Sequence, residues 1–131
     1  MAYIDNELLM FNDEAAAASM TSAAFDLGTN GGFNHPLFFD VKLTEALTSG
    51  SVDSIKVQSS VDSVFTTPVD EVEITVPSSI DPTAGPATLA QFFAPIKLSN
   101  RYVRLVITCT TPVGGKVSAY MTNGIGVPLG L

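Results

Sequence analysis

Hydrophobic and polar residues alternate along several segments of this chain, and the alternation predicts β-strands. In the clearest segment, 37–43, one face of the strand carries the apolar residues Leu37, Phe39, Val41 and Leu43. The other face carries Phe38, Asp40 and Lys42. Successive side chains point to opposite faces of a strand, so this pattern indicates a strand that is half-buried. The same period of two recurs in the segments 55–59, 72–76, 102–109 and 117–121.

Residues that favour turns separate these segments. Gly, Asn, Ser and Pro gather at 29–32, 48–51 and 112–115, which predicts three turns. The last of them joins two strands at the spacing of a hairpin, with a glycine at positive φ. Residues 77–87 contain three prolines and predict a loop within the domain.

Two segments have more than one plausible conformation. Residues 13–18 have good helix propensity but are too few for an isolated helix, so they form either one helical turn or an extended crossing. Residues 89–94 are apolar nearly throughout, which predicts a short strand or a turn close to the core.

The total number of strands indicates the fold class. Segments 8–11, 23–27 and the region around Phe92 bring the count to about eight short strands, a number typical of a jelly roll. We therefore expect an all-β fold, an antiparallel jelly-roll β-sandwich of about eight strands, in a single domain over residues 1–131. Residues 1–12 and 123–131 are candidates for assembly arms.

The composition favours a chain that associates with other chains. Of its 131 residues 46% are hydrophobic and 15% are charged, against about 25% charged in ordinary soluble domains. Self-association or docking explains such an apolar surface most simply. No apolar run approaches the roughly 18 residues of a membrane-spanning helix, and the N-terminus lacks the basic start of a signal peptide. Cys109 is the single cysteine, which excludes an internal disulfide and fits production in the cytoplasm.

The net charge of −7 is unevenly distributed along the chain. All thirteen acidic residues lie in residues 1–81, and the following fifty residues hold four basic residues and no acid. Four scattered bases cannot neutralise many phosphates, so nucleic acid is not expected as a direct ligand. The acidic and basic strands either offset one another within the fold or create a polarised surface that orients assembly.

The candidates for catalysis are weak. His35 is the only histidine and follows a turn, where a solvated or capping role is expected; one His and one Cys cannot form an ordinary zinc site. Glu71 and Glu73 are spaced like a glycosidase pair, but they are expected on the solvated face of a strand. With Asp70 they also lack the pattern of a calcium loop, and Gly28–Gly32 lacks the lysine of a phosphate loop. We therefore expect no enzyme, no metal and no cofactor.

Four segments of the chain together carry a resemblance to a known family. The segments are, in order, ELLMFNDEAAAASMTSAAFDLG (7–28), LFFDVKLTEALTS (37–49), SIKVQSSVDSVFTTPV (54–69) and LSNRYVRLVITCTTPVGGKVSAYM (98–121). They resemble segments of the capsid cement (decoration) proteins of tailed bacteriophages. The resemblance implies a jelly-roll sandwich on the outside of an icosahedral head that bridges neighbouring major capsid subunits. It also implies homo-oligomers, either dimers or trimers, on local symmetry axes, without cofactor or catalysis.

The expected role is therefore that of a structural virion protein, made in the host cytoplasm and located on the capsid exterior. The alternative is a carbohydrate- or receptor-binding jelly roll on the virion surface, although the absence of Trp disfavours a sugar platform. Arg101 and Arg104 are expected to pair with acidic groups of a neighbouring strand or subunit. The residues expected at protein interfaces are Tyr3, Ile4, Leu8, Leu9, Met10, Phe11, Arg101, Arg104, Val127 and Leu129.

Overall fold

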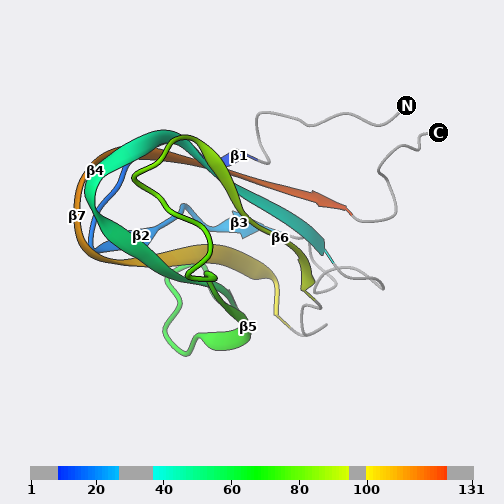
Figure 1. Ribbon diagram of the computed structural model, residues 1–131. Helices are drawn as coiled ribbons and strands as arrows, with labels where there is room; N and C mark the ends of the chain where they lie inside the picture. Colours follow the sequence, from blue (N-terminus) through cyan, green and yellow to red (C-terminus); the bar gives the residue numbers. More distant parts are fainter. Residues whose placement is uncertain (1–8, 27–36, 95–99, 124–131) are drawn as a thin grey trace.

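The computed structural model of the chain describes residues 9–26, 37–94 and 100–123 (Figure 1). This part of the chain consists of antiparallel strands with their connections and contains no helix. The strands in chain order are β1 (Leu9–Ala15), β2 (Ser19–Thr21), β3 (Phe25–Asp26), β4 (Leu37–Ser60), β5 (Val69–Thr75), β6 (Ala87–Ala94) and β7 (Tyr102–Asn123). The prediction of an all-β antiparallel fold is confirmed.

Two long strands form the centre of the fold. β4 has 24 residues and β7 has 22, and they pair with each other along almost their whole lengths. Both bend midway, so that the sheet folds over into two layers (Figure 1). This arrangement is consistent with a β-sandwich, whereas the jelly-roll topology stays a prediction.

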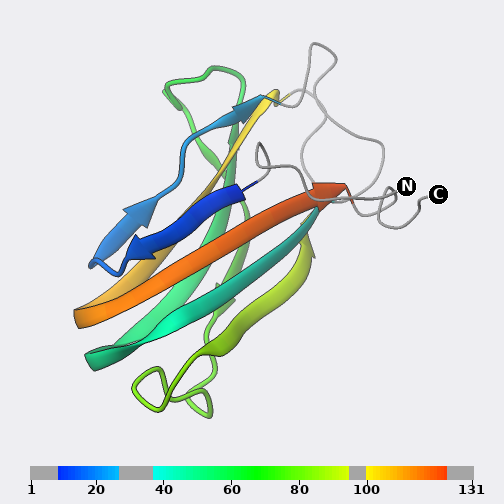
Figure 2. The same ribbon diagram turned by 90° about the horizontal axis from the view of Figure 1, so that it is seen from above.

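Each layer contains one half of each long strand. Layer one comprises β6, residues 37–47 of β4, residues 113–123 of β7, and β1. Layer two comprises β5, residues 51–60 of β4, residues 102–110 of β7, and the short strands β2 and β3. Figure 2 shows β1, β7, β4 and β6 side by side in layer one.

The predicted turn at 48–51 and the predicted hairpin at 112–115 are wrong as chain reversals. Both segments lie inside the long strands, where they form the corner between the layers: Leu47 pairs with Gly114, and Ser49 pairs with Val113. The glycines at the corner have positive φ, and register shifts adjoin them, so each strand bends sharply and then continues. The bent segment of β4 pairs with the bent segment of β7. This pairing keeps each strand running on into the second layer, so that neither strand turns back on itself. The described part of the chain therefore contains seven strands.

The two ambiguous segments are both extended. Residues up to Ala15 belong to β1, where Glu14 pairs with Val117 and Ala15 with Lys116, so the helical turn is wrong. Pairing with β7 outweighs the weak helix propensity of a short alanine run. Residues 89–94 lie in β6, as predicted. The proline-rich loop is also confirmed, and it packs onto the domain, because the amide of Leu47 donates to the carbonyl of Pro82 at 2.9 Å.

The hydrophobic core lies between the two layers. The inward rows predicted from the alternation are confirmed: Phe39 and Val117 of layer one and Ile55 and Leu105 of layer two are completely buried. The remaining buried apolar residues continue these rows and include Leu37, Val41, Leu43, Val57, Val103, Ile107, Cys109, Ala119 and Met121. A fully buried aliphatic side chain contributes about 1.5–3 kcal/mol, so these rows supply most of the stabilisation.

Candidate functional site

The residues predicted at protein interfaces divide into three groups. Tyr3, Ile4, Leu8, Val127 and Leu129 lie outside the described residues. Leu9, Met10 and Phe11 lie at the start of β1 in layer one. Arg101 and Arg104 lie at the start of β7 in layer two, so the structure places the second and third groups in different layers.

Met10 and Phe11 are part of the core of this chain. Leu9 pairs with Tyr120 and Phe11 pairs with Ala119, with a register shift between them. The extra residue turns both Met10 and Phe11 inward, and they are 6% and 4% exposed. Their apolar surface is thus used within the chain, and Leu9 alone of the three is half-exposed.

Arg101 pairs with an acidic residue of a neighbouring strand, one of the two partners expected from the sequence. Its guanidinium donates from Nε and Nη2 to the two carboxylate oxygens of Asp26, at 2.6 and 2.7 Å. This hydrogen bonding raises the pKa of Arg101 further above its ordinary value. Asp26 belongs to β3, which has two residues, so the pair helps to hold this short strand against β7.

Arg104 contacts a polar side chain and an aromatic ring. Its Nε donates to Oε1 of Gln58 at 2.9 Å, and its guanidinium carbon lies 4.2 Å from the ring centre of Phe65. This is a cation–π arrangement. Arg104 therefore joins the loop after β4 to β7, and it is half-buried.

The spacing of Glu71 and Glu73 does not place them on one face. A register shift lies between the pairs Val57–Val72 and Gln58–Asp70, which leaves Glu71 as the extra residue of a bulge. Glu71 accepts a hydrogen bond from the buried Ser59 at 2.6 Å, while Glu73 pairs with Lys56 and is exposed. The prediction that the two share a face is wrong, because the bulge breaks the period of two.

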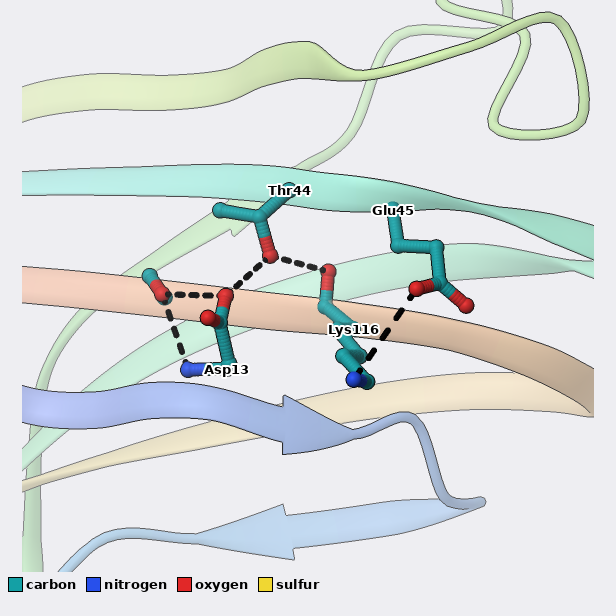
Figure 3. A network of polar contacts seen from close by, with 5 residues as sticks. Asp13, Thr44, Glu45 and Lys116 are labelled. Atoms are coloured by element: carbon teal, nitrogen blue, oxygen red, sulfur yellow. Dashed lines mark hydrogen bonds and ion pairs between the residues drawn. The ribbon is translucent and has the colours of Figure 1, made fainter.

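Polar groups near the corner tie three strands of layer one together (Figure 3). The hydroxyl of Thr44 donates to Oδ1 of Asp13 at 2.6 Å and approaches the carbonyl of Lys116 at 3.2 Å. The ammonium of Lys116 lies 3.9 Å from a carboxylate oxygen of Glu45. Asp13 has a φ of +47°, and its backbone amide donates a hydrogen bond to Ser118 Oγ at 2.9 Å. These contacts fix the edge strand β1 to the two long strands.

A second polar cluster lies on the other side of the corner. Asp53 accepts hydrogen bonds from the hydroxyls of Thr110 and Ser51, which lower its pKa. The neighbouring Cys109 is buried, and burial together with the charge of Asp53 raises the pKa of its thiol. A raised pKa suppresses the reactive thiolate, so we expect the thiol of this cysteine to be unreactive.

The outer surface of layer two is a network of paired polar groups. We call it the polar face; its residues are Lys56, Gln58, Asp70, Glu73 and Arg104. Asp70 accepts a hydrogen bond from Gln58 at 2.9 Å and lies 3.3 Å from the ammonium of Lys56. Gln58 in turn accepts from Arg104, so the donors and acceptors of this face largely satisfy one another.

The outer surface of layer one has a different character. We call it the aromatic face; its residues are Phe38, Asp40, Lys42, Gln91, Phe93 and Tyr120. The strand register places Phe38 opposite Phe93, and Asp40 between Gln91 and Tyr120. The rings of Phe38 and Phe93 are 5.0 Å apart, and Phe93 is 57% exposed. The outer face of a sandwich is normally polar, so these rings mark a candidate contact surface.

Sequence reasoning did not select the aromatic face, although one signal for it was present. The alternation placed Phe38 outward, beside Asp40 and Lys42. Phe93, however, lies in a segment that is apolar nearly throughout, and its single polar residue, Gln91, is not enough to show an alternation that would place Phe93 outward. Only the register of β6 on β4 brings the two rings together.

Two of the hollows on the surface are lined by described residues, and neither of these gathers groups for catalysis. One, of about 450 Å³, runs between β1 and β2 and is lined mainly by Ala, Ser, Thr and Met. The other, of about 490 Å³, lies between β4 and the loop after β5 and includes Asp53 and Asp81. Among the described residues no three of His, Cys, Asp and Glu lie close enough to hold a metal ion. The same part of the chain has no helix with the length and apolarity needed to cross a membrane.

Comparison with known proteins does not assign a family. No family model matches the chain, and no curated protein matches it. A solved structure with some similarity is described as dimeric latent PorU from Porphyromonas gingivalis, with a TM-score of 0.42 and 14% identity. The match covers 94% of this chain but 13% of that one, so the chain spans a small part of its length. A likeness at this level carries no conclusion about function.

Proposed function

We propose that the chain is a structural virion protein that binds the outside of an icosahedral phage capsid and bridges major capsid subunits. The observation that carries the proposal is the resemblance of four segments, in order and over most of the chain, to phage cement proteins. The exposed rings of the aromatic face support it, because a docking protein needs apolar surface outside its own core.

Such a protein stabilises a shell by mass action. Because it binds the assembled lattice and not the free subunits, its binding energy adds to the stability of the assembled state. Repeated contacts on symmetric sites add avidity when the protein is itself a dimer or trimer. The low content of charged residues suits extended contacts of this kind.

The test uses undecorated, expanded capsids of the phage that carries the gene. Purified protein is mixed with these capsids, and bound protein is quantified after sedimentation. The proposal expects stoichiometric, saturable binding and a higher temperature of capsid disruption. Absence of binding would overturn it. Light scattering of the free protein distinguishes a dimer from a trimer.

A second candidate is a carbohydrate- or receptor-binding module on the virion surface. The observation that favours it is the exposed ring of Phe93 on the outer face of the edge strand β6, beside strand β4 with its Asp40 carboxylate. A glycan array probed with the full chain tests this function, and a specific, saturable ligand would support it.

A further inference from the structure

The two outer faces of the sandwich differ in how well their polar groups are satisfied. On the polar face, the cations Lys56 and Arg104 already lie against Asp70 and Gln58. On the aromatic face, Oδ1 of Asp40 is buried and has no hydrogen-bond partner among the described residues. The ammonium of Lys42 lies 3.6 Å from the other oxygen, Oδ2, which is longer than a hydrogen bond.

We propose that the aromatic face is the docking face of this protein, and that it receives an arginine side chain from a protein partner. The inference rests on the proposed function, since it takes that partner to be the capsid shell. It adds which face of the sandwich touches the shell and which chemical group of the shell is recognised.

The unpartnered oxygen indicates what the partner must supply. A buried carboxylate oxygen without a donor is unfavourable, because the oxygen has lost its water without gaining a hydrogen bond. The Asp40 side chain keeps 18% of its surface exposed. Its terminal torsion is soft, so the carboxylate can rotate and turn the buried oxygen toward a donor from outside. A donor from a partner would therefore complete the site.

The aromatic surroundings favour arginine among the possible donors. A guanidinium is planar, stacks on aromatic rings and donates two parallel hydrogen bonds to a carboxylate. Asp40 is flanked along its own strand by Phe38 and across the ladder by Tyr120. The chain itself uses this chemistry elsewhere, because Arg104 stacks on Phe65 while it donates to Gln58.

The location of Phe93 and the net charge of the chain also favour the aromatic face as the docking face. The other exposed large apolar residues, Val61, Val64 and Val113, lie in a loop or at the corner, so among the described residues Phe93 is the exposed one on the outer face of a sheet, near the end of the edge strand β6. The net charge of −7 attracts a cationic surface and speeds its approach. The aromatic pair would then supply the buried, water-excluding centre that strong interfaces share.

Four variants test the face with undecorated, expanded capsids. Phe93→Ser removes the exposed ring and Asp40→Asn removes the carboxylate charge with little change of shape. Val64→Ser is the matched control for an exposed apolar residue, and Glu73→Gln is the control for one negative charge on the opposite face. The proposal expects the first two to weaken binding about tenfold or more and the two controls to bind like the wild-type chain.

Thermal unfolding of the same variants separates docking from folding. The buried oxygen of Asp40 forms no hydrogen bond in the folded chain, so its burial does not stabilise the fold. The variant Asp40→Asn is therefore expected to unfold at the same temperature as the wild type or at a higher one. Weak binding together with an unchanged unfolding temperature assigns Asp40 to the interface. Wild-type binding by both face variants would overturn the inference and leave the capsid function standing.

A small probe tests the arginine specificity without capsids. The full chain is titrated with N-acetyl-arginine amide and, separately, with the uncharged analogue N-acetyl-citrulline amide, while the aromatic resonances are followed by NMR. The inference expects Phe38, Phe93 and Tyr120 to shift with the arginine probe, and the shifts to be lost in Asp40→Asn. Equal shifts with both probes, or a response to a glycan in place of arginine, would overturn it. If the wild-type chain does not bind capsids, the proposed function is wrong. If the aromatic resonances of the wild-type chain do not shift with the arginine probe, the arginine site is wrong, whatever the result with capsids.

Discussion

Gly50 lies at the corner of β4 with a φ of +96°, a conformation that other residues rarely adopt. A Cβ atom at this position would lie 2.7 Å from the carbonyl oxygen of Thr110 and 2.8 Å from Cα of Pro112. Both are backbone atoms of β7, which cannot move without opening the corner. Gly50→Ala is therefore expected to lower the free energy of unfolding by roughly 2 kcal/mol or more, from strain and overpacking together.

Gly85 provides the matched control for this prediction. It also has a positive φ, +156°, but nothing lies within 4 Å of the position of its Cβ. Gly85→Ala is expected to cost about 1 kcal/mol, from backbone strain alone. Urea denaturation of the two variants measures the difference, and equal losses would show that the close approach of β4 and β7 does not constrain the corner.

At the scale of elements, two loops depend on aspartates that accept hydrogen bonds. In the loop after β4, the Thr66 hydroxyl is the main cause that lowers the pKa of Asp62, followed by the Ser60 hydroxyl. In the loop after β5, the hydroxyl and then the amide of Thr83 lower the pKa of Asp81. A carboxylate whose folded pKa is below its unfolded value stabilises the fold above the unfolded value, near 3.8. This contribution is lost as the pH falls through the folded pKa.

The expected result is a fall in the unfolding temperature as the pH drops below about 3.8, where the carboxylates become protonated first in the unfolded and then in the folded chain. Asp62→Asn cannot lose a charge in this range, so its unfolding temperature should change less with pH than that of the wild type. Differential scanning calorimetry at a series of pH values makes the measurement. A variant as sensitive to acid as the wild type would contradict the role assigned to Asp62.

The start of β1 separates core residues from contact residues. Phe11 is 4% exposed, and removal of such a ring from a core costs about 3–5 kcal/mol. We expect Phe11→Ala to lose close to this amount, and Leu9→Ala, at a half-exposed position, to lose clearly less. Deletion of residues 1–12 would therefore unfold the domain as well as affect assembly. Chemical denaturation of the two point variants tests this, and similar losses would place both side chains in the same environment.

The strands were predictable because each buried row has a clear period of two. Leu37, Phe39 and Val41 alternate with outward residues, and the structure buries them as expected. The bends were not predictable, because a glycine at positive φ permits both a hairpin and a corner. The strand that pairs with the glycine-containing segment decides between the two conformations. In this fold the paired residues Leu47 and Gly114 are separated by 67 positions in the sequence. Local signals do not contain such a pairing.

At the scale of the whole molecule, the candidate contact surface was less predictable than the core. Met10 and Phe11 were expected at an interface, but a bulge turns both into the core, and no local signal marks the bulge. The aromatic face depends on which side of β4 receives β6, and on the register that sets Phe38 opposite Phe93. A surface assembled from separate strands follows from topology and not from any single segment.

The long strands β4 and β7 run through both layers, so we expect the two layers to unfold together. Neither half of β4 can leave the sheet without disturbing the other half across the corner, and one continuous core joins them. Tyr102 pairs with Ser60 in layer two and Tyr120 pairs with Asp40 in layer one, so the two tyrosines report on separate layers. Fluorotyrosine incorporated at both positions allows each layer to be followed by ¹⁹F NMR during urea denaturation. Coincident midpoints and slopes are expected for one cooperative unit. Two separate midpoints would show that the corner behaves as a hinge between independently stable sheets.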